Sequence, residues 1–325
     1  MDLVTGGAGF LGRHVVNALR AAGRPVRILD LQAPRDLPAD VERCVGSVTD
    51  PGAVRQALNG VRRVFHLAAI PELWARDKTA FDRVNRRGTQ TVLDAARCTP
   101  TLERFVHTSS ETVLVPRAGR PLPDHLDESL ELTPDDVIGP YARSKREAEM
   151  AVLAAARDGF PATVLIPTMP LGPNDASRTP PTRMVTDMLA GRTPAAIDAM
   201  MNVVDVRDAA WGHLLAADHG RSARRYLLAG ENVTMPQFME RLSRAANAPM
   251  PSRVIPGWMA RSFAAADEVV ADRVTGRAPR APLDGVRIAC RQRPFDGARA
   301  RQELGFDPRP LMSTLQDTVT WLRQA

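Results

Sequence analysis

Tyr141 and Lys145 are the two residues whose types and spacing most directly indicate chemistry. The chain contains only two tyrosines, Tyr141 and Tyr226, and only two lysines, Lys78 and Lys145. One of each stands four positions apart, which is one turn apart on the same face of a helix. A tyrosine has an ordinary pKa near ~10, and a cation held one turn away lowers that pKa. The pair predicts a general acid/base that exchanges a proton with a substrate hydroxyl while a hydride moves elsewhere. The simpler alternative is a surface tyrosine stacked on a lysine stem.

A hydride carrier needs a binding site, and the first residues of the chain have the pattern of one. Gly6, Gly9 and Gly12 stand between an apolar strand expected at residues 3–5 and a helix expected at 13–22. Glycines at this spacing let the turn tighten and let the backbone approach a pyrophosphate, which the N-terminus of the helix then receives. The arrangement predicts a dinucleotide-binding turn.

Asp30 ends the next expected strand, at residues 25–29, and lies 18 positions after Gly12. A carboxylate at this point can bind both hydroxyls of the adenosine ribose and repels a 2′-phosphate, so it favours NAD over NADP. Arg27 and Arg35 are near enough to keep NADP as the less favoured alternative. Without a cofactor role, Asp30 would be a turn residue at a strand end.

Composition and charge exclude several other classes of protein. The formal net charge is +6 and the pI about 10.0, but the arginines are interspersed with Asp and Glu, so no nucleic-acid-binding stripe is expected. Cys44, Cys98 and Cys290 are far apart, which argues against a metal site or a disulfide framework and fits a reducing cytoplasm. No apolar run approaches the roughly 18 residues that a membrane span needs.

Strands and helices alternate along the first two thirds of the chain, which predicts an α/β, Rossmann-type, doubly wound parallel sheet. We expect an NAD(P)-binding part at 1–167, to which 201–230 returns, and a smaller, mostly helical substrate-binding lobe at 168–200 and 231–325. The proline- and glycine-rich segment after residue 167 is typical of a loop. His66 and His107 fall inside expected strands and are interpreted as structural. The expected strands lie at 3–5, 25–29, 41–45, 63–69, 104–110, 162–166, 202–204 and 225–228, and the expected helices at 13–22, 52–58, 78–96, 182–190, 206–217, 238–246 and 312–322, together with the helix that carries Tyr141.

In this order, the motifs resemble those of the extended short-chain dehydrogenase/reductases, within the NAD-dependent epimerase/dehydratase family. The similarity extends over essentially the whole chain. Residues 138–145 and 228–234 are most similar to the branch of hopanoid-associated sugar epimerases and dihydroflavonol-reductase-like proteins. The segments that carry the resemblance are 5–12, 66–69, 85–89, 108–110, 141–145, 167–173, 203–206 and 300–305.

The resemblance implies roles for individual residues. Tyr141 would be the general acid/base, Lys145 would bind the nicotinamide ribose and lower the pKa of Tyr141, and Ser110 would bond the reacting oxygen. The residues implied to contact the cofactor are Gly6, Gly9, Phe10, Leu11, Gly12, Asp30, Ser47, Val48, Leu67, Ala68, Ala69, Asn85, Tyr141 and Lys145. The substrate would be a small molecule, and we expect a homodimer.

The sequence departs from the family pattern mainly where the substrate would bind. Ser47 stands where the family has an aspartate that contacts adenine. Ser110 is followed by Glu111 and Thr112, whereas dehydratases have an Asp-Glu pair, so sugar dehydration is not expected. The nucleotide-sugar epimerases place an arginine for the diphosphate within the segment equivalent to 195–201, which here contains none. The remaining candidate substrate residues are Ser109, Glu111, Asn174 and Arg183, with Arg192 as a further possible substitute for the missing arginine.

Three functions are compatible with these residues. The favoured one is a redox-neutral epimerase of a sugar or nucleotide-sugar, because Asp30 indicates NAD that stays bound. The second is a reductase or dehydrogenase with net turnover of the cofactor. The third is a nucleotide sensor without chemistry, against which the intact Ser110, Tyr141 and Lys145 argue.

Overall fold

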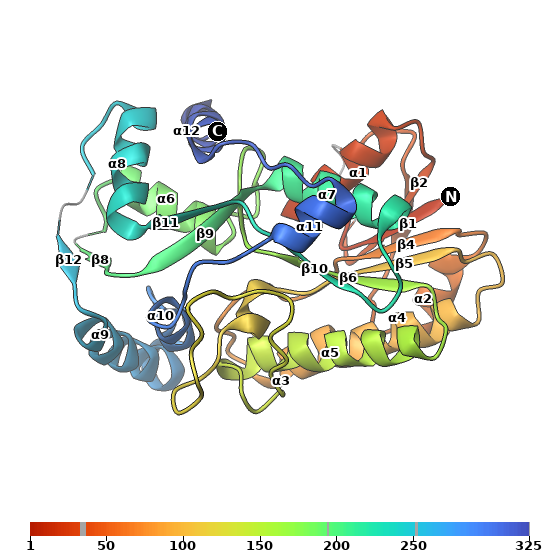
Figure 1. Cartoon of the computed structure of the whole chain (residues 1–325), viewed down its shortest axis with the longest axis horizontal. Coiled ribbons are helices and arrows are strands. Elements are labelled where there is room, and N and C mark those ends of the chain that lie inside the picture. The colour runs from red at the N-terminus through yellow and green to blue at the C-terminus, as the bar shows by residue number, and fades with distance from the viewer. Residues whose placement is uncertain (33–36, 194, 251–252, 325) are drawn as a thin grey trace.

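The chain is built around a seven-stranded parallel sheet (Figure 1). The computed structural model describes residues 1–32, 37–193, 195–250 and 253–324. The strand order is β10-β6-β5-β4-β1-β2-β3, so β2 and β3 are added on one side of β1, and β4 and the later strands on the other. Ligands of such sheets bind at the carboxyl ends of the strands where the order reverses, here between β1 and β4. The strands of this sheet are β1 (Asp2–Thr5), β2 (Val26–Asp30), β3 (Glu42–Val45), β4 (Arg63–His66), β5 (Arg104–Thr108), β6 (Ala162–Pro167) and β10 (Arg225–Leu228).

Helices cover both faces of this sheet, which explains why its central strands are apolar on both sides. Leu3, Val64 and Phe105 face one layer of helices and Val4 and Phe65 face the other, and all five are fully buried. The predicted doubly wound α/β fold is therefore confirmed. The first layer contains α2 (Pro51–Leu58), α4 (Gly88–Arg97) and α5 (Gly139–Arg157), and the second contains α1 (Phe10–Ala21), α7 (Val206–His219) and α11 (Ala298–Leu304).

The helix expected at 78–96 is interrupted. It consists of α3 (Thr79–Phe81), a π-helical section η1 (Asp82–Arg87) and α4. Sections of this kind often occur next to functional sites. Here the section contains Asn85, which is enclosed and whose side chain holds the backbone of Ile70, at the edge of the cavity described below.

A second, three-stranded sheet has the order β11-β9-β7 and consists of β7 (Met169–Leu171), β9 (Met200–Asp205) and β11 (Glu231–Thr234). The prediction of a loop after residue 167 is wrong at β7. Pro170 is tolerated there because β7 is an edge strand, where a missing N–H is not needed by a neighbour. Of the segment 201–230 that was expected to return to the Rossmann part, α7 and β10 pack on the main sheet, whereas β9 belongs to this second sheet.

The remaining elements lie mostly at the end of the molecule away from α2 (Figure 1). They pack around the second sheet and around a two-stranded one, and among the described helices none is long and apolar enough to cross a lipid bilayer. They are η2 (Glu111–Leu114, a 3₁₀ turn beside the main sheet), α6 (Pro180–Leu189), β8 (Ala196–Ile197), α8 (Met235–Ala246), β12 (Val254–Ile255), α9 (Gly257–Val270), η3 (Ala271–Thr275, π-helical), α10 (Leu283–Ala289) and α12 (Leu311–Gln324).

Candidate active site

One large cavity, of about 1170 Å³, lies at the carboxyl ends of the main strands and continues between α6, the second sheet and α10. Most of the residues that the sequence singled out line it, although they come from distant parts of the chain. They are Gly6, Gly9, Phe10, Leu11, Gly12, Asp30, Ser47, Val48, Leu67, Ala68, Ala69, Ser109, Ser110, Glu111, Tyr141 and Lys145.

The glycine turn has the shape that a dinucleotide needs. Gly6 adopts φ +72°, and a Cβ there would lie 2.8 Å from the backbone nitrogen of Ala68. A Cβ on Gly12 would lie 2.0 Å from the carbonyl oxygen of Gly6, so only glycine allows α1 to start this close to β1. No side chain caps the start of α1 at Gly9, which leaves the first-turn amides of the helix facing the cavity. These features fit a pyrophosphate.

Asp30 ends β2 at the rim of the same cavity. Its Oδ2 accepts a hydrogen bond from the backbone N–H of Ala8 at 3.0 Å, and its Oδ1 accepts one from Leu31 N–H at 2.7 Å. The carboxylate is therefore fixed beside the glycine turn, as a ribose ligand would be. Arg27 is bonded to Glu42 and to backbone carbonyls, which engages it away from the cavity, and Arg35 lies outside the described residues.

Two expected cofactor residues, Ser47 and Asn85, have side chains that bond other groups of the protein. Ser47 lines the cavity, but its hydroxyl is also bonded to Thr49, with 2.7 Å between the two oxygens. Asn85 lies behind the wall of the cavity. Its amide bonds the backbone of Ile70 and donates to Ser144 Oγ at 3.1 Å, so it supports the lining at Ile70 and does not itself face the cavity.

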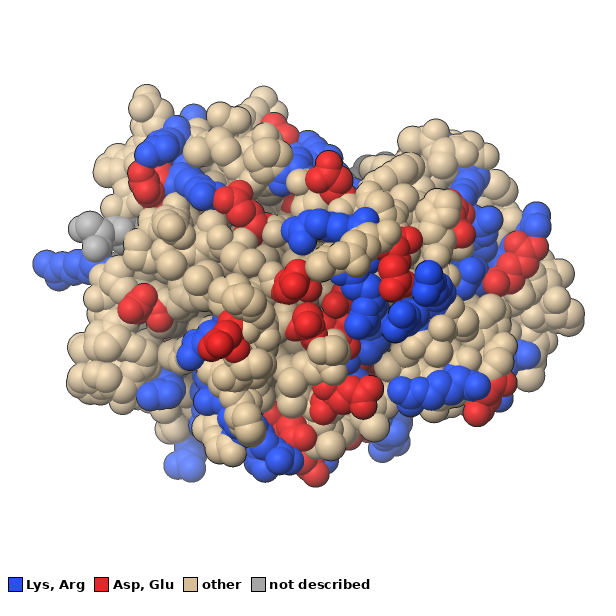
Figure 2. Space-filling view, in the orientation of Figure 1, with Lys and Arg blue, Asp and Glu red and all other residues tan. Residues whose placement is uncertain are grey.

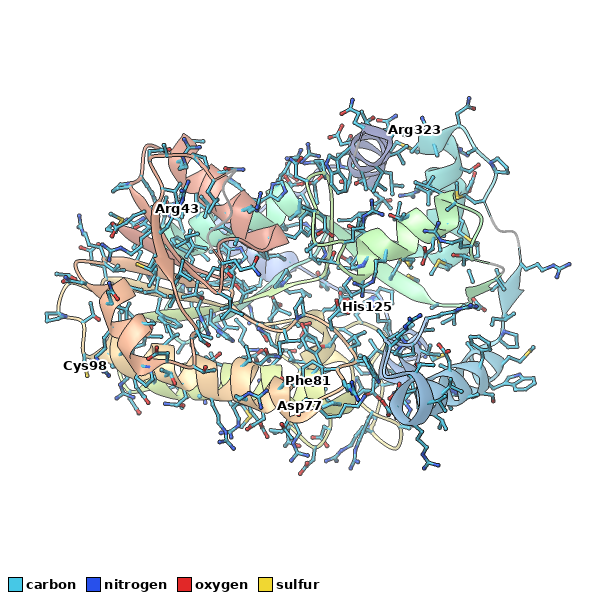
Figure 3. The ribbon with its side chains drawn as sticks, turned by 180° about the vertical axis from the view of Figure 1, so that it is seen from behind. Arg43, Asp77, Phe81, Cys98, His125 and Arg323 are labelled. Carbon is cyan, nitrogen blue, oxygen red and sulfur yellow. The ribbon has the colours of Figure 1, made fainter. Side chains whose placement is uncertain are left out.

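Tyr141 projects from the first turn of α5 into the cavity, and its ring packs edge-on against Phe81, whose position is labelled in Figure 3. Burial raises the pKa of Tyr141 above its ordinary value, a hydrogen bond with Ser110 lowers it, and the Glu111 carboxyl raises it. The expected lowering of this pKa by Lys145 is therefore not found, because loss of hydration at the phenol outweighs the stabilising contact with Ser110.

Lys145 is buried one turn further along α5, and its ammonium donates a hydrogen bond to the carbonyl oxygen of Thr108 at 2.5 Å. This contact fixes the lysine against the end of β5, beside Ser110. Burial lowers the pKa of Lys145 to about 8, and the nearby carboxylate of Glu149 opposes that shift. Ser110 N-caps the 3₁₀ turn η2, and its Oγ accepts from the hydroxyl of Thr112 at 3.1 Å.

A buried charge network lies directly behind these residues. The carboxylate of Glu149 is fully enclosed and contacts Arg146 Nη1 at 2.6 Å and Arg225 Nε at 2.8 Å. Its other oxygen accepts a hydrogen bond from Ser109 Oγ at 2.5 Å. The hydroxyl of Ser109, a candidate substrate residue, is thus held by this network and is not directed at a ligand. The sequence did contain a signal for Glu149, which lies four residues after Lys145 on the same helix.

Glu111 is a carboxyl group with no cation within ion-pair distance among the described residues. Its Oε1 accepts a hydrogen bond from Gln292 Nε2 at 3.2 Å, and its Oε2 is enclosed without a hydrogen-bond partner among the described residues. Burial raises the pKa of Glu111 to about 8, so near neutral pH the group is mainly an uncharged acid that can donate a hydrogen bond. Gln292, which the sequence gave no reason to select, follows α10 and also lines the cavity.

The other candidate substrate residues lie outside the lining of the cavity. Asn174 is exposed in the segment between β7 and α6 and has φ +68°. Arg183 is exposed on α6 and forms an ion pair with Glu72 at 2.7 Å. Arg192 forms an ion pair with Asp187 at 2.6 Å. Among the residues that the structure describes, none of these arginines supplies the missing contact for a diphosphate.

His66 and His107 are structural, as expected from their place in strands. The hydroxyl of Thr89 donates to the carbonyl of Asn85, so His66 Nε2–H donates to Thr89 and His66 Nδ1 accepts from Thr5. Burial lowers the pKa of His66 to about 3, which keeps this tautomer neutral. His107 is buried and stacks on His66 with 5.5 Å between ring centroids.

The end of the cavity beyond Tyr141 is mostly apolar. Five methionines from four elements line it, and methionine adapts readily to irregular apolar ligands. The only cations in the lining, as far as the structure describes it, are Arg13 beside the glycine turn and Lys145. The apolar lining residues of this end are Met169, Met184, Met200, Met201, Met235, Ile197, Ala199, Ile288 and Ala289, with Pro170, Pro180 and Pro181.

Comparison with known proteins agrees with this geometry. Residues 3–229 match the model of the NAD dependent epimerase/dehydratase family. The chain is 34% identical to a Synechocystis protein named, provisionally, dihydroflavonol 4-reductase, over 98% of this chain and 94% of that one. It is 31% identical to sterol demethylase protein B of Methylococcus capsulatus, over 99% and 98% of the two chains.

The same fold is found among solved structures. The crystal structure of gox2253 is 32% identical, covers 100% of this chain and 98% of its own, and superimposes with a TM-score of 0.85. Membership of a family defined by its dependence on NAD supports NAD as the cofactor. The chain belongs to the NAD dependent epimerase/dehydratase family and is an enzyme of the extended short-chain dehydrogenase/reductase class.

Proposed function

We propose that this enzyme is an NAD-dependent oxidoreductase that interconverts a secondary alcohol and a ketone on a largely apolar skeleton of sterol or isoprenoid size. The observation that carries the proposal is the substrate end of the cavity, which methionines and other apolar side chains line and where, among the described residues, no arginine or lysine is available for a diphosphate. The names of the two relatives, a dihydroflavonol reductase and a sterol demethylase, point in the same direction.

The residues around Tyr141 are suited to the proton part of this reaction. Bound NADH would supply the hydride in reduction, and bound NAD would accept it in oxidation. In the direction of ketone reduction, the Tyr141 hydroxyl donates its proton to the carbonyl oxygen, and Ser110 Oγ donates a second hydrogen bond to the same oxygen. In oxidation, the phenolate takes the proton of the alcohol.

Lys145 and Asp30 would hold the cofactor in place. Lys145 is anchored to the carbonyl of Thr108, so its remaining N–H groups are free to donate to the nicotinamide ribose. Its charge near the phenol favours the phenolate, once a bound cofactor and substrate complete the site. Asp30, fixed by Ala8 N–H and Leu31 N–H, would accept from the adenosine ribose.

Glu111 is a polar group at the substrate end whose Oε2 has no hydrogen-bond partner among the described residues, while its Oε1 is bonded to Gln292. As an uncharged acid, it could donate from Oε2 to a second oxygen on the substrate, near the reacting carbon. A ligand with a polar group near the reacting carbon and an apolar remainder would match both this group and the methionine lining.

Steady-state turnover distinguishes the proposal from its alternatives. With NAD and a 3-hydroxysterol, or with NADH and the corresponding ketone, we expect cofactor conversion in proportion to substrate, and Tyr141→Phe as a control should remove it. Conversion of a UDP-sugar to its epimer with no net change in NADH absorbance, and no turnover of apolar alcohols, would overturn the proposal.

Redox-neutral epimerisation is the second candidate, and Asp30 is the observation that favours it. A carboxylate bonded to both Ala8 and Leu31 is well placed to retain NAD, and an epimerase must keep its reduced cofactor until the ketone is reduced again. Mass spectrometry of the purified protein addresses this directly, since an epimerase should carry NAD through purification. The homodimer and the cytoplasmic location remain predictions, and sedimentation velocity would test the first.

A further inference from the structure

Helix α9 and the π-helical turn η3 expose their large apolar residues and bury their small ones. Ala260, Ala264 and Ala271 are at most 5% exposed, whereas Trp258 is 63% and Phe263 57% exposed. A helix that packs only on its own protein shows the reverse distribution. The large exposed apolar residues of this segment are Trp258, Met259, Phe263, Val269, Val270 and Val274, and we call this set the α9 face.

The members of the α9 face lie together. Phe263 lies four positions after Met259, and Val270 lies seven positions after Phe263, a spacing that places all three on one side of a helix. Ala266, between Phe263 and Val270, is also exposed. Contiguous exposed apolar surface on a protein marks a site of interaction with another surface. In Figure 2, the end of the molecule where Figure 1 places α9 shows an uncharged surface with an acidic group on it and basic groups along its lower edge.

The carboxylates of this segment are bonded to other groups of the protein. Asp267 accepts a hydrogen bond from Arg280 N–H, and Glu268 accepts one from Leu283 N–H, each within 2.8 Å. Asp272 accepts from the indole nitrogen of Trp74 at 2.9 Å. These contacts tie Asp267 and Glu268 to the start of the α10 segment and Asp272 to Trp74. Asp272 itself is exposed, and Lys78 Nζ lies 3.6 Å from its Oδ1, so its charge is paired.

The arginines beside the α9 face, by contrast, are exposed and unpaired. Arg253, Arg261, Arg273 and Arg277 have no carboxylate within ion-pair distance in the described part of the chain. An apolar strip with aromatic residues and arginines at its border is the pattern of a helix that lies in the interface of an anionic bilayer. In a two-fold dimer formed through this face, the same arginines would meet one another, which disfavours a second copy as the occupant.

The α9 face and the substrate end of the cavity lie on opposite sides of α10. Ala260 and Ala264 of α9 pack on Val286 of α10. From the opposite side of α10, Ile288 and Ala289 line the cavity. A single helix thus separates the exposed apolar surface from the apolar end of the active site.

We propose that the α9 face docks on the surface of an anionic lipid bilayer, with Trp258 and Phe263 in the interface and Arg261 and Arg273 near lipid phosphates. The suggestion that docking delivers an apolar substrate to the cavity rests on the proposed function. The docking itself does not, because it depends only on the exposed residues of α9 and η3.

Vesicle co-sedimentation of the full-length protein without substrate tests the docking. We expect the protein to sediment with vesicles of phosphatidylglycerol and phosphatidylcholine, and to remain largely in the supernatant with phosphatidylcholine alone or at high salt. In the double variant Trp258→Ser/Phe263→Ser, the partition coefficient of the protein onto the anionic vesicles should fall on the order of tenfold or more, because both aromatic side chains that insert into the bilayer are lost. Trp211→Ser is the matched control, since Trp211 is 51% exposed but lies on α7, and it should bind as the wild type does.

Arg261→Glu/Arg273→Glu should also lose binding to the anionic vesicles while the melting temperature stays unchanged, since both arginines are exposed and unpaired. Failure of the wild type to bind, or equal binding by Trp258→Ser/Phe263→Ser, would overturn the proposal. So would a dimer in sedimentation velocity that these two substitutions dissociate, because the face would then join two copies. Activity on a short-chain alcohol, measured separately, reports on the proposed function and not on docking.

Discussion

Replacing Glu149 by Gln should destabilise the protein strongly, although Glu149 does not line the cavity. The substitution keeps the size of the side chain and its bond to Ser109, but removes the negative charge that contacts both Arg146 and Arg225. Breaking a buried ion pair by removing one partner costs ~3–5 kcal/mol, because the charge left behind stays out of water.

The expected change in melting temperature follows from the length of the chain. For 325 residues, the entropy of unfolding is about 0.7 kcal/mol per kelvin, so a loss of ~3–5 kcal/mol lowers Tm by about 4–7 °C. Differential scanning fluorimetry measures this directly. Glu147→Gln is the matched control two residues earlier on α5, where the ion pairs with Arg143 and Arg86 are partly exposed and should contribute under ~1 kcal/mol.

A second measurement separates this mechanism from general damage. Glu149 is the group that opposes the lowering of the Lys145 pKa to about 8. In Glu149→Gln, the Lys145 pKa should fall further, so activity that needs the protonated lysine should be lost at lower pH as the pH rises. The reasoning would be refuted if the Tm of Glu149→Gln lay within 2 °C of the wild type, or equalled the Tm of Glu147→Gln, and the pH profile of kcat were unchanged.

Three further substitutions have defined outcomes. Tyr141→Phe should lower kcat by ~10²–10⁴ because the proton donor is lost, while fluorescence titration shows NAD affinity within a few-fold of the wild type; near-normal turnover would exclude Tyr141 as the acid/base. Asp30→Ala should weaken NAD binding more than NADP binding, and tighter binding of NADP than of NAD to the wild type would contradict the ribose role. Because burial raises the Glu111 pKa to about 8, the folded state binds more protons than the unfolded one between pH ~4.5 and 8, and stability falls as pH rises through that window. Urea unfolding should show that the free energy of unfolding of the wild type falls by on the order of 2 kcal/mol from pH 5 to pH 8. This is less than the full pKa shift would give, because the group borders a cavity open to water. The fall should be smaller in Glu111→Gln, and equal falls in both proteins would show that Glu111 is not the titrating group.

Much of the fold and of the cofactor site could be predicted from the sequence because local patterns determine them. The apolar runs of β1, β4, β5 and β6 predict buried parallel strands, and parallel strands bring their carboxyl ends to one edge. The glycine turn, Asp30 and the Tyr141/Lys145 pair are each defined by a few neighbouring residues, so their spacing alone indicates their place relative to that edge.

The charges around the site could not be predicted in the same way. The sequence indicates that Ser109 and Glu111 lie near a strand end and that Lys145 lies on a helix. It does not indicate which groups each of these residues contacts. Arg225 comes from β10 and Gln292 from beyond α10, and they reach Glu149 and Glu111 only after the chain has folded. The raised pKa of Tyr141 likewise depends on how completely these segments remove water from the phenol.

The sequence by itself determined the fold class, and it predicted the glycine turn and the Tyr141/Lys145 pair as the candidate cofactor and acid/base residues, because these depend on residues close in the chain or on strand geometry common to all parallel sheets. Only the tertiary structure decided that Arg183 is tied to Glu72 outside the cavity, and that methionines from β7, α6, β9 and α8 converge on the substrate end. The character of a substrate site depends on which distant side chains pack around one volume, and the spacing of residues along the chain does not contain that information.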